Sequence, residues 1–201
     1  MKALDPGMTE DEILAEFRAC EALLDGHFIL SSGLRSARYL QCARVLMEPR
    51  RAERLARALA AKLPDALRDS IDIVVSPAMG GVIIGHGIGR ALGTPAMFVE
   101  RPEGRFGLRR GFRLEPGQRV LMVEDVVTTG LSSKEAIAAI EEAGGTVVAA
   151  ASLVDRSGGT VALGVPFTSL IAIDVPTYRA DALPPALAAI PAVKPGSRAA
   201  G

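Results

Sequence analysis

The chain has 201 residues, enough for one well-buried α/β domain, and 49% of them are apolar, as in ordinary globular proteins. Its 23 basic and 23 acidic side chains cancel, which argues against binding of nucleic acid or an anionic membrane through overall charge. Cys20 and Cys42 form no CxxC pattern, so neither a disulfide scaffold nor a zinc site is expected. With no signal peptide and no apolar run long enough to span a bilayer, we expect a cytoplasmic protein.

We divide the expected single domain into a hood region, 1–45, an α/β core, 46–175, and a Pro-rich tail, 176–201. The first of these regions begins with a helix signal. Thr9 and Glu12 have the spacing of a capping box that begins a helix, and Gly26 is its expected stop. Short strands are expected at 28–30 and 38–41, around a turn.

The core alternates between helical and strand patterns. A helix is predicted from Pro49 to Leu63, with apolar residues on one face. The strands predicted after it are 71–75, 96–99, 119–123, 146–154 and 169–174, and the helices are 81–92 and 132–143. Near-continuous apolar strands separated by helices indicate a parallel sheet covered on both faces, so the predicted fold class is α/β. A Gly at every fourth position from Gly81 to Gly93 predicts a smooth helix face for close packing.

Two segments are predicted without regular structure. Residues 101–116 read as a long loop, and the Pro-rich tail is expected to be loosely structured, with at most a short helix at 186–190. His27 is expected at the surface or in a turn.

Two adjacent acids mark the candidate site. Glu124 and Asp125 follow the apolar residues 120–123, at the carboxyl end of a strand, where open α/β sheets bind ligands. Adjacent carboxylates are costly there unless something uses them, and two ribose hydroxyls or a hydrated Mg²⁺ would do so. The alternative is a solvated acidic pair with no ligand.

A phosphate site is predicted directly after the acids. Residues 128–133 read Thr-Thr-Gly-Leu-Ser-Ser and lead into the helix 132–143. A Gly in the turn lets backbone N–H groups point inward, the hydroxyls add donors, and the helix N-terminus adds positive potential. Acids for a sugar diol followed by donors for a phosphate predict a ribose 5-phosphate site; the alternative is an ordinary polar helix cap.

Residues 123–130, Val-Glu-Asp-Val-Val-Thr-Thr-Gly, resemble the phosphoribosyl pyrophosphate (PRPP) motif of type I phosphoribosyltransferases. Residues 28–39 resemble the N-terminal signature of the orotate phosphoribosyltransferases in that group, and residues 153–156 resemble their Asp-Arg pair at a strand end. Residues 76–81 resemble the loop beneath the pyrophosphate. The resemblance covers residues 10–175 and implies the type I phosphoribosyltransferase fold, a central parallel sheet flanked by helices, with a small hood and a flexible loop.

The resemblance implies transfer of phosphoribosyl from PRPP to orotate, with Mg²⁺ held through substrate and water rather than directly by the protein. This is a step of pyrimidine nucleotide (UMP) synthesis. It also implies a homodimer in which the loop 101–113 of one subunit closes over the site of the other.

The same resemblance assigns the site residues. The expected catalytic residues are Asp125, Glu124, Arg101 and Arg105. The expected PRPP-binding residues are Arg101, Glu124, Asp125, Val126, Val127, Thr128, Thr129, Gly130, Leu131 and Ser132. Thr128 and Arg156 are expected at orotate, with Arg156 receiving its carboxylate; the alternative for Arg156 is a surface residue after a strand.

The loop can also be interpreted from its residues alone. Residues 101–113 hold five Arg against one Glu, and three Gly give it freedom to move. A flexible cationic loop beside a phosphate site suits a lid that neutralises departing pyrophosphate. The alternative is an exposed basic loop without a ligand.

The chain also departs from the best-known members of the family. Those carry Lys residues and a His in the loop, Tyr-Lys where this chain has Met79-Gly80, and a Lys where it has Ser31. Two alternatives therefore stay open: a phosphoribosyltransferase for another base, such as a purine, and a PRPP-sensing regulator without catalysis. Against the regulator, the chain shows no helix-turn-helix and no basic stripe.

Overall fold

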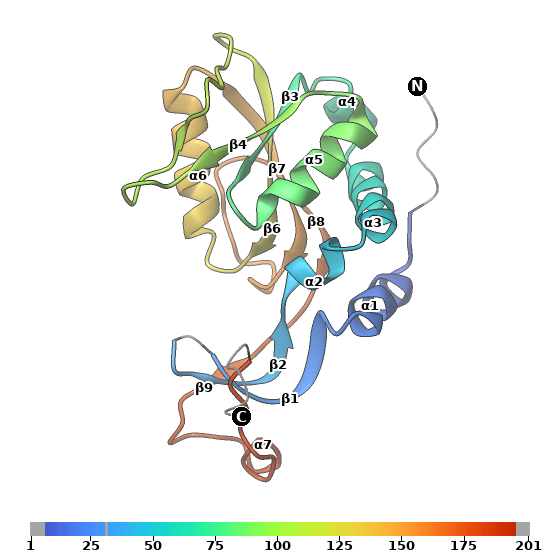
Figure 1. The fold of residues 1–201 in the computed structure, drawn as a ribbon, viewed down its shortest axis with the longest axis vertical. Helices are drawn as coiled ribbons and strands as arrows, with labels where there is room; N and C mark the ends of the chain where they lie inside the picture. The colour runs from blue at the N-terminus through green and yellow to red at the C-terminus, as the bar shows by residue number, and fades with distance from the viewer. Residues whose placement is uncertain (1–6, 31, 196–201) are drawn as a thin grey trace.

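The computed structural model describes residues 7–30 and 32–195, and within them the chain forms two sheets (Figure 1). In this described part, the larger sheet has the strand order β5-β4-β3-β6-β7-β8. Its strands are β3 (Ile73–Pro77), β4 (Ala96–Glu100), β5 (Gly107–Leu108), β6 (Arg119–Val127), β7 (Thr146–Asp155) and β8 (Phe167–Ala172). All neighbouring pairs are parallel except β4 and β5. The predicted parallel α/β core is confirmed.

Helices cover both faces of the larger sheet. They are α3 (Pro49–Lys62) and α5 (Gly81–Leu92) on one face and α6 (Leu131–Glu142) on the other (Figure 1). Alternate residues of β6 divide between the two layers: Leu121 packs in the cluster that contains Ile84 of α5, and Met122 in the cluster that contains Ile140 of α6. A strand buried on both faces must be apolar at every position, which is why β6 reads as a continuous apolar run.

The glycines of α5 allow the close packing that their spacing predicts. A Cβ on Gly85 would lie 1.9 Å from the Ser76 hydroxyl oxygen, and one on Gly89 would lie 2.9 Å from the Cβ of Ala96. Gly93 has a φ of 75° and ends the helix in the left-handed conformation that glycine tolerates best.

The smaller sheet forms the hood. Its strands are β1 (Leu23–Ile29), β2 (Arg35–Leu40) and β9 (Thr177–Tyr178), and α1 (Glu10–Ala19) precedes them. The capping box of Thr9 and Glu12 is present. The predicted helix stop at Gly26 is wrong, because α1 already ends at Ala19 and Gly26 lies inside β1. Pairing of β1 with β2, which places Leu23 opposite Leu40, draws this segment into the sheet.

The tail is more ordered than its composition predicts. The short helix expected at 186–190 is present as α7 (Pro185–Ala188); in addition the tail contains β9, and Val193 forms a parallel bridge with Phe28 of β1. His27 is 5% exposed, so its predicted surface position is wrong: its Nδ1 donates to the Ile190 carbonyl at 2.9 Å. The tail therefore completes the hood, because its backbone groups pair with a distant strand.

The structure contains two short helices that the sequence did not predict. They are α2 (Cys42–Leu46) and α4 (Asp65–Arg68), each too short to show a helical period. No described helix is long and apolar enough to cross a membrane.

Candidate active site

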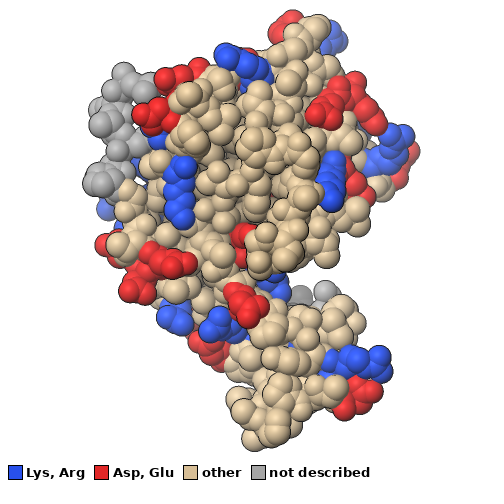
Figure 2. All heavy atoms as spheres, turned by 180° about the vertical axis from the view of Figure 1, so that it is seen from behind, with Lys and Arg blue, Asp and Glu red and all other residues tan. Residues whose placement is uncertain are grey.

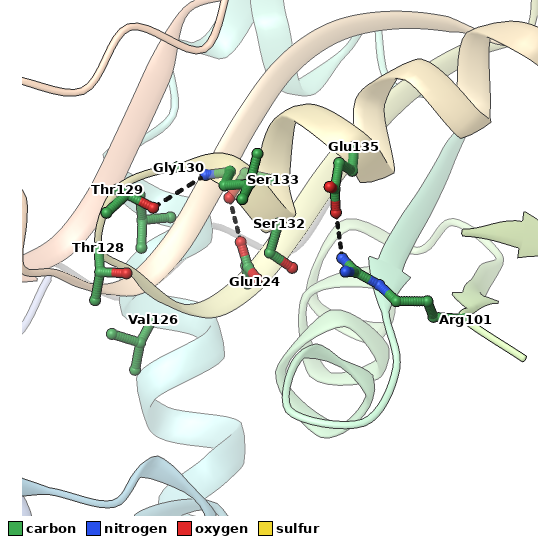
Figure 3. Close-up of a pocket in the computed structure, with 11 residues that line it drawn as sticks. Arg101, Glu124, Val126, Thr128, Thr129, Gly130, Ser132, Ser133 and Glu135 are labelled. Atoms are coloured by element: carbon green, nitrogen blue, oxygen red, sulfur yellow. Dashed lines mark hydrogen bonds and ion pairs between the residues drawn. The ribbon is translucent and has the colours of Figure 1, made fainter. Parts of the chain in front are cut away.

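The carboxyl end of β6 borders a cavity of about 240 Å³ (Figure 3). The strand continues past its predicted end at Val123 to Val127, because Glu124 and Val126 pair in register with β7. The cavity is lined by the predicted residues Arg101, Glu124 and 126–132, and also by Ser133 and Glu135. The structure thus brings the predicted phosphate loop, one of the two acids and one loop arginine to one place.

Glu124 is held beneath the start of α6. Its side chain is only 8% exposed, and the Ser133 hydroxyl donates a hydrogen bond to its carboxylate (Figure 3). Burial raises the pKa of Glu124 above its ordinary value, hydrogen bonds from Ser133 and Ser132 oppose that rise, and the charge of Asp125 adds to it. Ser133 belongs to the predicted phosphate segment 128–133 but was not among the residues expected to bind PRPP; the structure shows it bonded to Glu124 instead.

Asp125 faces a different neighbour from Glu124, as the alternation of a strand requires. It does not line the 240 Å³ cavity; a Cβ on Gly80 would lie 2.5 Å from its carboxylate oxygen. Burial raises the pKa of Asp125, and hydrogen bonds from backbone N–H groups oppose the rise. The glycine at position 80, which at first appeared only as a departure from the family, is what leaves room for this carboxylate.

The phosphate loop has the backbone that its sequence predicts. Gly130 has a φ of 75°, and a Cβ there would lie 2.4 Å from a methyl carbon of Val161, so glycine is required. The Leu131 N–H is 3.4 Å from the Thr129 hydroxyl oxygen, at the N-terminus of α6. The backbone N–H groups at a helix N-terminus and the helix dipole make this a suitable place for an anion.

Two arginines of the 101–113 loop pair with acids of α6 in their own chain, and Arg110 pairs with Glu100 of β4. Arg101 pairs with Glu135, and its guanidinium lies 4.1 Å from the centre of the Phe106 ring. Arg105 lies outside the cavity and pairs with Glu142 at 3.3 Å. Arg101 therefore lies at the cavity, whereas Arg105 lies farther along α6, beside Glu142.

A second cavity, of about 520 Å³, lies between the hood and the core. Figure 2 shows the molecule hollowed between these two parts. Thr128 lines both cavities, and Arg156 lines the second, so the two residues predicted at the base lie together. Within residues 7–30 and 32–195, the buried Nε of Arg156 has no hydrogen-bond acceptor, and burial lowers the pKa of its guanidinium. Ser31, noted above for the missing Lys, lies outside the described residues.

Comparison with known proteins identifies the family of the chain. A model of the phosphoribosyl transferase domain matches residues 46–176. The chain is 75% identical over 193 residues to the orotate phosphoribosyltransferase of Rhizorhabdus wittichii, across 96% of this chain and 98% of that protein. The chain belongs to the orotate phosphoribosyltransferases. The orotate phosphoribosyltransferase of Novosphingobium aromaticivorans is 72% identical, across 96% of this chain and 99% of that one.

Solved structures of orotate phosphoribosyltransferases share the fold. The enzyme of Aeropyrum pernix aligns with a TM-score of 0.64 and 27% identity over 80% of this chain and 93% of that one. The Mycobacterium tuberculosis enzyme in complex with PRPP aligns with a TM-score of 0.61 and 28% identity, over 80% and 95% of the two chains. The predicted type I phosphoribosyltransferase fold is confirmed.

The burial of Glu124 gives a pH-dependent prediction. Because its pKa is raised above the ordinary 4.5 in the folded protein, the folded state holds this proton more tightly than the unfolded state. Its contribution to stability is full below pH 4.5 and is lost as pH rises through the folded-state pKa. We expect Glu124→Gln to lose less free energy of unfolding between pH 4.5 and neutrality than the wild type, measured by urea denaturation across that range.

The matched control is Glu141→Gln, an exposed acid near the end of α6. It should follow the wild-type pH dependence. If Glu124→Gln also follows it, burial of Glu124 has no energetic consequence and the argument from its position fails.

Proposed function

We propose that the chain transfers the 5-phosphoribosyl group of PRPP to orotate, giving orotidine 5′-monophosphate and pyrophosphate in pyrimidine nucleotide synthesis. One observation carries the proposal: Thr128 lines both the cavity at the start of α6 and the second cavity, which Arg156 also lines. A phosphorylated sugar in the first cavity and an anionic base in the second would meet at Thr128, where the new bond has to form.

The reaction is a displacement at the anomeric carbon of ribose and needs no protein nucleophile. Positive charge develops on the sugar and negative charge on the departing pyrophosphate, so positioning and electrostatics supply most of the acceleration. Glu124 and Asp125 bind the ribose and stabilise its developing positive charge. The backbone and hydroxyls of residues 128–132 hold the 5′-phosphate, and Arg156 receives the carboxylate of orotate in bidentate fashion.

Magnesium fits this site as a substrate-bound ion. Among the described residues, no group of three or more His, Cys, Asp or Glu side chains could hold a metal, whereas Glu124 and Asp125 offer hard oxygen donors beside the substrate. When bound, Mg²⁺ would neutralise charge on the leaving pyrophosphate. The residues that would hold it, through water, are these two acids.

We further propose that the protein acts as a homodimer, in which the 101–113 loop reaches the partner's site. This loop carries five arginines and three glycines, and the contacts of Arg101 and Arg105 to α6 are exposed ion pairs, which are weak and can be exchanged for phosphate contacts. We also propose a cytoplasmic location, because PRPP carries charges that cannot cross a hydrocarbon layer.

The lid role of the loop predicts that Arg101→Ala slows turnover. In the lid role, the Arg101 guanidinium leaves Glu135 and binds the departing pyrophosphate. We expect its removal to lower kcat by about 10- to 100-fold, the loss typical of one charge-assisted contact. PRPP should also protect residues 101–116 of the wild type from protease. Arg90→Ala, an exposed arginine of α5, is the control and should keep wild-type kcat. Equal cleavage with and without PRPP would contradict the lid role.

The function itself is tested by pyrophosphate release from PRPP with orotate, uracil, adenine or no base. We expect release with orotate alone. If pyrophosphate is released with a purine and not with orotate, the purine is the substrate. If PRPP binds but no base causes release of pyrophosphate, the protein is a PRPP-sensing regulator. Against a nucleic-acid-binding regulator, basic and acidic side chains lie interspersed on the face in Figure 2.

A further inference from the structure

The C-terminal tail supplies part of the wall of the cavity between the hood and the core, called the base cavity from here on. Lys194 and Pro195 of the tail line it beside Ile29 of β1. The same cavity is lined by Thr128 and Arg156, where the proposed function places orotate. The shape that the cavity offers to a base therefore depends on where the tail lies.

Hydrogen bonds to β1 hold this part of the tail. The Nδ1 of His27 donates to the Ile190 carbonyl at 2.9 Å. The Val193 N–H donates to the His27 carbonyl, and the Val193 carbonyl accepts from the Ile29 N–H, each at 2.8 Å. The side chains bury little apolar surface, because Ile190 is 44% exposed and Val193 is 57% exposed. Docking of residues 190–195 therefore depends mainly on these hydrogen bonds.

The imidazole of His27 is used for the tail. Its side chain is buried, and within residues 7–30 and 32–195 its Nε2 has no hydrogen-bond partner. Nδ1 carries the proton, because the Ile190 carbonyl can only accept. A leucine would fill the same place in the hood without a polar group to bury, so the bond to the tail is what distinguishes a histidine here.

We propose that His27 is a positioning residue for the base: it holds the tail against β1, so that the tail completes the wall of the base cavity around orotate. The inference rests on the proposed function. When the tail is released, the cavity loses part of its wall, and the apparent affinity for the base falls with the fraction of molecules that keep the tail docked. PRPP should be unaffected, because no described tail residue lines the cavity at the start of α6.

The first test is steady-state kinetics of the full-length wild type, His27→Leu and His27→Asn, varying orotate and PRPP separately. We expect His27→Leu to raise KM for orotate about 3- to 10-fold, the effect of one lost hydrogen bond, with KM for PRPP changed less than about twofold. Asparagine carries an N–H donor as far from the backbone as Nδ1, so His27→Asn should restore most of the affinity. His86→Leu replaces the exposed histidine of α5 and, as the control, should keep both KM values.

A second pair of variants tests the tail itself and decides the matter alone if His27→Leu does not fold. Val193→Pro removes the N–H that bonds to the His27 carbonyl, whereas Val193→Ala shortens the same exposed side chain and keeps that N–H. Only the proline variant should raise KM for orotate.

Hydrogen exchange of the Val193 amide reports docking of the tail without turnover. Because linkage is reciprocal, a ligand that fills the base cavity should slow this exchange in the wild type. Orotidine 5′-monophosphate, which carries the base, should do so, and ribose 5-phosphate, which lacks it, should not. Exchange in His27→Leu should be faster than in the wild type when no ligand is present.

Three results would refute the role of His27 while the proposed function stands. They are an equal rise of both KM values in His27→Leu, no recovery in His27→Asn, and Val193 exchange that orotidine 5′-monophosphate leaves unchanged. If the wild type does not turn over orotate, the proposed function fails first and this inference fails with it.

Discussion

Replacing Asp125 by Asn is expected to lower kcat/KM for PRPP by about 10- to 1000-fold, since one lost charged contact at a reacting group is worth about 1.5–4 kcal/mol. The side chain keeps its size and loses its charge. Asp125 forms no ion pair with any residue in the described part of the chain, and burial raises its pKa. A carboxylate kept partly out of water without a cation is costly to the folded protein, and the ribose of PRPP is the group that would use it.

The same argument predicts that Asp125→Asn does not destabilise the fold. Removing a desolvated charge should leave the free energy of unfolding at neutral pH unchanged or higher, measured by urea denaturation beside the kinetics. Asp69→Asn is the control: it is an exposed aspartate following α4, at the opposite end of the strands from the site (Figure 1), and should keep wild-type kinetics. A folded Asp125→Asn with wild-type kcat/KM would refute the role of this acid.

The second large effect is expected from Arg156→Ala. We expect KM for orotate to rise by about 10- to 100-fold and KM for PRPP to change far less, because the lost charge-assisted contact is worth about 1.5–3 kcal/mol and lies at the base. The prediction rests on the guanidinium Nε of Arg156, a residue that lines the cavity between the hood and the core. This Nε is buried and, among residues 7–30 and 32–195, has no hydrogen-bond acceptor. A buried donor without an acceptor is explained if a bound ligand accepts its hydrogen bond.

Discrimination between bases separates this role from a structural one. Arg156→Ala should also lose preference for orotate over uracil, because uracil never used the contact. Arg18→Ala, an exposed arginine at the end of α1, is the control and should leave both KM values and the preference unchanged. If both KM values of Arg156→Ala stay at wild-type levels, Arg156 is only a residue that follows a strand.

The corrections to the sequence interpretation have a common cause. The helix 81–92 was predicted to the residue, because its glycine spacing and the stop at Gly93 are local signals. The stop at Gly26 and the loose tail were wrong, because β1, β2 and β9 are held by pairing between residues far apart in the chain. His27 appeared to be a surface residue because no local pattern shows that the Ile190 carbonyl will cover it.

By itself, the sequence determined the parallel α/β core, the Gly130 turn at the start of α6 and the two acids at the end of β6. These features depend on residues that are close together in the chain. Apolar strands alternate with helices, Gly130 must adopt a positive φ, and α6 begins where the loop ends. Only the tertiary structure decided which groups surround Glu124 and Asp125: Glu124 lines the 240 Å³ cavity, whereas Asp125 lies against Gly80. It also brought Arg156, Thr128 and the distant Lys194 to one cavity, because strand pairing and layer packing place residues by contacts that no sequence spacing specifies.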